Sequence, residues 1–173
     1  MLRGLVAALL LVAAACPAGA EPPAFADVHL HYNWDQEEVT SPAAAVRRLK
    51  ANNVVLGVVS GVPARRALKL REAAGPWIIP LFSPYIHHRG RTDWFDDPRV
   101  VERARAALES GRFFGIGEAH FIAGVGPSFR NEVVQGLFDL AREYDVPFLI
   151  HTESSSHEYF QPVCEANPDI RFQ

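Results

Sequence analysis

The stretch Ala26-Asp27-Val28-His29-Leu30-His31 sets the pattern for the rest of the chain. In an extended strand the side chains alternate between two faces, so Asp27, His29 and His31 share one face. The two imidazole rings are then close enough for their nitrogens to converge on one metal ion. A half-buried strand with two histidines on its polar face explains His-x-His equally well. Residues later in the chain therefore have to decide between the two interpretations.

Apolar runs and segments typical of helices alternate along the chain. Continuous apolar runs such as 54–59 are typical of strands covered on both faces, as in parallel sheets. We predict strands at 25–30, 54–59, 77–82, 113–118, 146–151 and 170–172, and helices at 40–51, 63–74, 98–110, 129–144 and 157–166. This order indicates an α/β fold with helices covering a parallel sheet, and it fits a doubly wound open sheet or a barrel.

The composition is that of a globular protein with a hydrophobic core. The chain has 173 residues, of which 49% are hydrophobic and 21% are charged. The formal net charge of −3 gives no electrostatic reason to expect nucleic acid or an anionic membrane as a partner. We therefore expect no nucleic-acid partner, and the oligomeric state stays open.

Residues 1–20 have the order of segments that is typical of a secretory signal peptide. Arg3 is followed by the apolar run 5–15 and by the small residues Ala18-Gly19-Ala20. We predict cleavage of 1–20, export to the periplasm or the medium, and no stable membrane insertion afterwards, because the run is short for a bilayer span. Lipid attachment at Cys16 is the alternative.

Polar side chains recur where the predicted strands end. His31 follows the first strand, Glu118 and His120 end the fourth, and His151 ends the fifth. In a parallel barrel the carboxyl ends of the strands meet at one face, where active sites are built. Histidine and carboxylate ligands suit a catalytic divalent metal, so we predict zinc, with manganese or iron as alternatives.

Three of these strand ends together resemble the amidohydrolase superfamily of metal-dependent hydrolases. The similarity is greatest to the branch of amidohydrolase-related enzymes and aromatic-acid decarboxylases. The segments that carry it are Phe25-Ala26-Asp27-Val28-His29-Leu30-His31, Gly115-Ile116-Gly117-Glu118 and Pro147-Phe148-Leu149-Ile150-His151-Thr152-Glu153. The resemblance implies a (β/α)8 TIM barrel that hydrolyses an ester, lactone or amide-like small molecule with water activated by the metal.

The resemblance also implies roles for individual residues. His29, His31 and His151 correspond to metal ligands, and Glu118 takes the place of a metal-bridging residue. The sixth-strand histidine and eighth-strand aspartate of the family have no counterpart up to Gln173. The resemblance therefore predicts that 21–173 is the N-terminal part of the barrel, with about five βα units, and is not a competent catalyst by itself.

Other residues receive roles from their positions next to these motifs. We predict Glu118 and His120 as the catalytic residues, and Asp27 and Glu153 as carboxylates that orient the metal-binding histidines. Two alternatives to hydrolysis stay open: non-oxidative decarboxylation at the same site, and an inert barrel fragment that binds metal without turnover.

Overall fold

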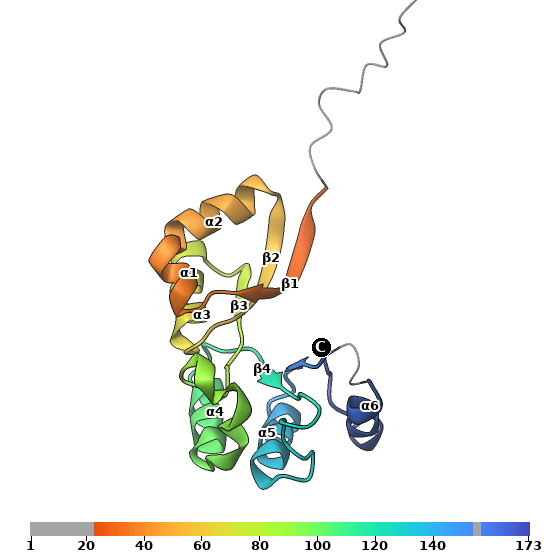
Figure 1. The fold of residues 1–173 in the computed structure, drawn as a ribbon. Helices are drawn as coiled ribbons and strands as arrows, with labels where there is room; N and C mark the ends of the chain where they lie inside the picture. The colour runs from red at the N-terminus through yellow and green to blue at the C-terminus, as the bar shows by residue number, and fades with distance from the viewer. Residues whose placement is uncertain (1–22, 154–156) are drawn as a thin grey trace, which may run out of the picture.

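The computed structural model describes residues 23–153 and 157–173, in which strands and helices alternate along the chain (Figure 1). The predicted signal peptide at 1–20 and the alternative lipid attachment at Cys16 lie outside the described residues, so both stay predictions. Among the described helices, none combines the length and the apolar character that a membrane span requires.

Within the described residues, the strands form two small parallel sheets. The first sheet has the order β1-β2-β3 and contains β1 (Phe25–His31), β2 (Val54–Ser60) and β3 (Ile78–Pro80). The second sheet pairs β4 (Ile116–His120) with β5 (Phe148–His151). β2 has a neighbour on each side, which suits its run of valine and leucine.

Two isolated bridges continue this order of strands. Phe82, just after β3, pairs with Ile116 of β4, and Phe148 of β5 pairs with Phe172. Both bridges are parallel, as are all the pairs within the two sheets. The carboxyl ends of the five strands therefore point in one direction, and side chains at those ends can meet.

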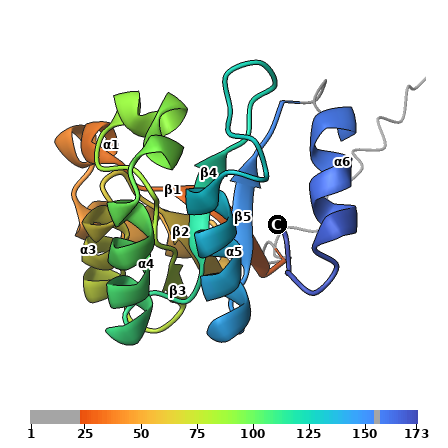
Figure 2. The same cartoon turned by 90° about the horizontal axis from the view of Figure 1, so that it is seen from below.

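Helices connect the strands and pack along them. Figure 2 shows α3, α4 and α5 side by side along the strands. Ser41 begins α2 by accepting a hydrogen bond from the Ala44 amide, and Asn131 begins α5 by accepting one from the Val133 amide. The helices are α1 (Trp34–Val39), α2 (Pro42–Ala51), α3 (Arg65–Ala74), α4 (Arg99–Glu109), α5 (Glu132–Glu143) and α6 (His157–Ala166), with the 3-10 helices η1 (His88–Thr92) and η2 (Trp94–Asp96).

Helix α1 was not predicted from the sequence. Its six residues are too few to form a stable helix by themselves. One local and one tertiary contact hold it instead. The Asn33 amide donates to Oε1 of Gln36 at 2.6 Å within the helix start, and Oδ1 of Asn33 accepts from the distant Val62 amide at 2.8 Å. The start of α1 is thus tied to the segment that follows β2.

The larger hydrophobic core packs α4, α5 and α6 against β4 and β5. Its centre is Phe121, which directly follows His120 and is fully buried. The Phe121 ring centroid lies 5.6 to 6.5 Å from those of four other aromatic rings, Trp94, Phe138, Phe148 and Phe160. This packing holds the end of β4 in place, and with it the polar residues that β4 carries.

The prediction of a (β/α)8 TIM barrel is wrong. The structure is a small α/β domain with two parallel sheets of three and two strands. A barrel requires each strand to pair with a neighbour on both sides until the sheet closes. In the described part of the chain, β1 pairs with β2 alone among the strands, and the two sheets are linked by the bridge between Phe82 and Ile116. Alternating strands and helices occur in open and closed parallel sheets alike, so the alternation could not separate them.

Candidate metal centre

Five side chains from three strand ends gather at one place. His29 and His31 come from β1, Glu118 and His120 from β4, and His151 from β5. Their ligand atoms form two overlapping groups, His29-His31-Glu118 and Glu118-His120-His151, and within each group the atoms lie within 4.8 Å of one another. The structure thus brings together all the residues predicted as metal ligands and His120, and this group could hold a divalent metal ion.

The carboxylate of Glu118 lies at the centre of the group. Its Oε1 is 2.9 Å from Nδ1 of His151 and 3.3 Å from Nε2 of His29, and its Oε2 is 3.5 Å from Nε2 of His31. The Glu118 side chain is 7% exposed, whereas these three imidazoles are 37 to 44% exposed. The carboxylate therefore forms the floor of the site, and the three rings line its opening to solvent.

The surroundings of Glu118 favour its ionised form. Burial by itself would raise the pKa of this carboxyl, but the positive charges that His31 and His120 can carry and the hydrogen bond from His151 outweigh burial and lower the pKa. Glu118 is therefore ionised at neutral pH, as a metal-binding carboxylate must be.

Pairing between the strand ends sets the position of Glu118. His31 is opposite Ser60 in the pairing of β1 with β2. The Ser60 hydroxyl accepts a hydrogen bond from the Glu118 amide at 2.9 Å and donates one to the Gly117 carbonyl at 3.1 Å. Ser60 is 1% exposed, so both contacts are shielded from water. This serine links the first sheet to β4 and keeps the histidines of β1 next to the carboxylate.

His120 and His151 are neighbours across β4 and β5. They are paired in the sheet, and their rings stack with centroids 4.3 Å apart and planes 18° apart. Because His151 donates to the Glu118 carboxylate through Nδ1–H, its neutral ring has a free lone pair on Nε2. A free imidazole nitrogen is what a metal ion requires.

Tyr85 determines which nitrogen of His120 is free. The Tyr85 hydroxyl contacts the Glu118 carbonyl and lies 2.5 Å from Nδ1 of His120. Since a carbonyl can only accept, the Tyr85 hydroxyl donates its hydrogen bond to the Glu118 backbone carbonyl. The phenol oxygen then accepts from Nδ1–H of His120. Burial, together with the charge of Glu118, raises the pKa of Tyr85 and keeps its proton in place. Neutral His120 is then left with an unprotonated Nε2.

Two histidines of the site, His31 and His120, are held neutral. Burial lowers the pKa of His120 to about 4 against the opposing charge of Glu118, and His151, Arg91 and His31 lower it further. Burial also lowers the pKa of His31, again against Glu118. Neutral imidazoles beside an ionised carboxylate form a donor set that suits a divalent ion at neutral pH.

These pKa shifts predict that the metal-free protein loses stability as the pH falls from 6.5 towards 4. Over this range the unfolded chain protonates His120, whereas the folded protein keeps it neutral, so acid favours unfolding. The slope from His120 should be below about 1.4 kcal/mol per pH unit, since the opening to solvent screens the site. This slope is measured by urea unfolding at a series of pH values, with a chelator present to keep the protein free of metal. His120→Gln should flatten the slope, and an equally steep slope in that variant would contradict this origin.

The two carboxylates predicted to orient the histidines belong to neither ligand group. Oδ1 of Asp27 accepts from the His29 amide at 3.1 Å, so it restrains the backbone between them and does not touch an imidazole. Glu153 is exposed just after β5 and, within the described part of the chain, has no hydrogen bond or ion pair. Sequence reasoning missed Tyr85 and Ser60, although Ser60 ends a strand and the strand-end argument could have included it.

No family model matches the chain, and no curated protein matches it either. The resemblance to the amidohydrolase superfamily therefore stays a prediction from three motifs. The site itself rests on the geometry of the described residues, namely a buried carboxylate, four imidazoles and two hydrogen-bonding side chains that orient them.

Proposed function

We propose that this chain is a metal-dependent hydrolase that acts on an ester, lactone or amide-like small molecule and uses zinc, with manganese or iron as alternatives. This proposal replaces the expectation that 21–173 is not a competent catalyst by itself, because that expectation rested on an incomplete barrel and the fold is not a barrel. The observation that carries the proposal is the buried Glu118 carboxylate with three imidazole nitrogens 2.9 to 3.5 Å from its oxygens. Buried carboxylates are usually paired with a cation. These three histidines are 37 to 44% exposed, so burial in the core does not explain why they surround the carboxylate.

His29, His31, Glu118 and His151 would hold the ion. Imidazole nitrogens and carboxylate oxygens are usual zinc ligands in catalytic sites, which also keep one position open for water. When bound, a divalent ion polarises a carbonyl oxygen and lowers the pKa of a water molecule. The ligands come from both sheets, so binding would also link β1 to β4 and β5.

His120 is the residue that we assign to proton transfer. Its Nε2 is free to accept the proton of the attacking water and to return it to the leaving group. Burial lowers the pKa of His120, and the charge of Glu118 opposes this lowering and so favours the imidazolium during the reaction. Tyr85 holds the ring in the tautomer that this step requires. The predicted signal peptide would place this chemistry outside the cytoplasm.

Metal loading and hydrolysis in the same preparations test the proposal. Metal-free protein is incubated with zinc, manganese or iron and desalted, and the bound metal is then measured by mass spectrometry. A panel of nitrophenyl esters, lactones and anilides reports hydrolysis. We expect about one ion or more per chain and hydrolysis that depends on it. In the double variant His29→Ala/His31→Ala, both should fall to the level of the metal-free protein with little change in circular dichroism.

A matched control separates loss of ligands from loss of imidazoles in general. His87 is exposed and belongs to neither ligand group, so His87→Ala should keep metal content and hydrolysis. Undiminished metal in the double variant would rule out this site. Release of carbon dioxide from aromatic acids without hydrolysis of any probe would contradict the hydrolase assignment and favour the decarboxylase.

A further inference from the structure

A cavity of about 520 Å³ adjoins the metal centre. His120 and His151 line part of its wall, and η1 lines another part with His88, Arg89 and Arg91. The volume is in the range of sites that bind small molecules. Two arginines therefore face the same space as two histidines of the candidate site.

The guanidinium groups of this wall have no ion-pair partner in the described residues. Neither Arg89 nor Arg91 has a carboxylate within ion-pair distance there. Other arginines are paired, such as Arg105 with Glu143 at 2.6 Å and Arg142 with Asp169 at 2.6 Å.

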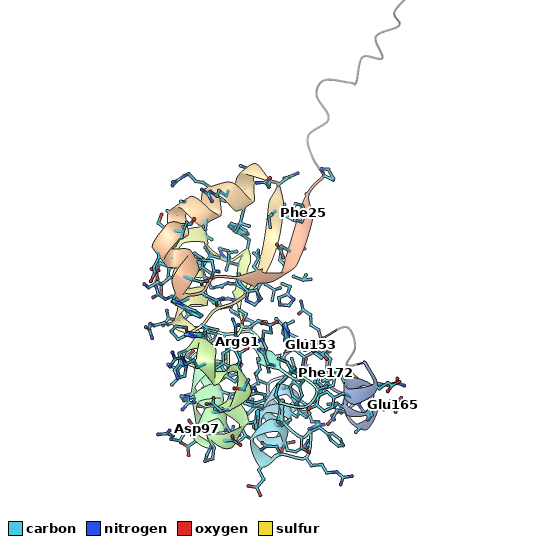
Figure 3. The ribbon with its side chains drawn as sticks, viewed as in Figure 1. Phe25, Arg91, Asp97, Glu153, Glu165 and Phe172 are labelled. Atoms are coloured by element: carbon cyan, nitrogen blue, oxygen red, sulfur yellow. The ribbon has the colours of Figure 1, made fainter. Side chains whose placement is uncertain are left out.

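Packing fixes the basic segment against the site. Gly90 is buried between the two arginines, and a Cβ at that position would lie 2.8 Å from Cβ of Tyr85. The His88 ring packs on Trp34 with centroids 5.0 Å apart. Figure 3 shows Arg91 where the part of the molecule built on β1–β3 meets the part built on β4 and β5. The wall is thus attached to Tyr85, which also holds His120.

We propose that Arg91, assisted by Arg89, binds an anionic oxygen group of the substrate, so that the substrate class is a small molecule with a carboxylate or phosphate beside the bond that reacts. This inference rests on the proposed function for the reaction but not for the binding. Arginine presents a planar fork of donors that matches such oxygens in two parallel hydrogen bonds. A cleft with unpaired positive charge also concentrates anions from solution.

Binding to the metal-free protein tests the anion site independently of hydrolysis. Benzoate, phenyl phosphate and the neutral isostere benzamide are titrated against tryptophan fluorescence, because Trp34 contacts His88 at the cavity wall. We expect an anion to bind about 10- to 100-fold more tightly than benzamide. Arg91→Gln should remove that preference and leave benzamide binding unchanged. Benzoate and phenyl phosphate distinguish carboxylate from phosphate recognition.

The controls address position and charge. Arg47 is an exposed arginine on α2 that lines none of the site, so Arg47→Gln should bind the anions as the wild type does. Arg91→Lys keeps the charge but loses the fork and should retain part of the preference. Equal affinity for anions and benzamide, or full anion affinity in Arg91→Gln, would overturn the inference. Anion binding that depends on Arg91 in a protein without metal or hydrolysis would uphold the inference while the proposed function fails.

Discussion

Replacing Glu118 by glutamine should lower the affinity for zinc by about 100-fold or more. Glu118 belongs to both ligand groups, and its carboxylate is the one charge that compensates a divalent ion in either group. Glutamine keeps the shape and one acceptor oxygen, so the variant removes charge without opening a cavity. Replacing a residue that merely orients a ligand typically lowers metal affinity about 10- to 100-fold. Replacing a ligand that both groups share should lower the affinity at least as much. Competition with a chromophoric chelator at neutral pH measures the affinity.

The matched control for this variant is Glu153→Gln. Glu153 is also close to a strand end but is exposed and outside both ligand groups. Its replacement removes the same charge and should change zinc affinity less than about twofold, because an exposed charge is screened by solvent. If both variants bound zinc like the wild type, Glu118 would not be a ligand and the proposed centre would have to be abandoned.

Gly117→Ala should destabilise the folded protein by about 3 kcal/mol or more, for reasons of backbone conformation and space. The backbone of Gly117 has a φ of +127°, a value that residues other than glycine rarely adopt. A Cβ added there would collide with the carbonyl oxygen of Leu149 and lie 2.8 Å from its Cβ. β5 would have to move away from β4, and His151 would move away from Glu118. Urea unfolding and zinc titration measure the two consequences.

Gly124→Ala separates the two causes. Gly124 also has a positive φ, of +84°, but an added Cβ would meet no atom within 4 Å. Its replacement should cost about 1 kcal/mol from conformation alone and leave zinc affinity unchanged. Equal losses in the two variants would show that the contact between β4 and β5 is not the reason that position 117 is glycine.

The ligands of the candidate site could be predicted from the sequence because they depend on a general property of parallel strands. Parallel strands present their carboxyl ends at the same edge, so polar residues that end different apolar runs come together. Only approximate strand ends are needed for this convergence. His31, Glu118 and His151 therefore come together in one site although the predicted fourth strand, 113–118, is shifted from the observed β4.

The residues that orient the ligands could not be predicted in this way. Tyr85 lies in the segment after β3, where no periodic pattern specifies direction, and its hydroxyl meets His120 only after β3 and β4 are side by side. Arg91 faces the site because Gly90 packs against Tyr85. These contacts join residues that are far apart in the sequence, and a pattern within one segment contains no information about them.

The sequence by itself determined the α/β class, the parallel strands and the donor set of the candidate metal site, because apolar runs and strand ends are local features. Only the tertiary structure decided the arrangement of the strands, with β1, β2 and β3 in one sheet and β4 with β5 in another. The alternating pattern specifies that a strand is buried but not which strand pairs with it. Pairing is settled by hydrogen bonds and side-chain packing between distant segments, such as Ser60 with Glu118, and these exist only in the folded chain.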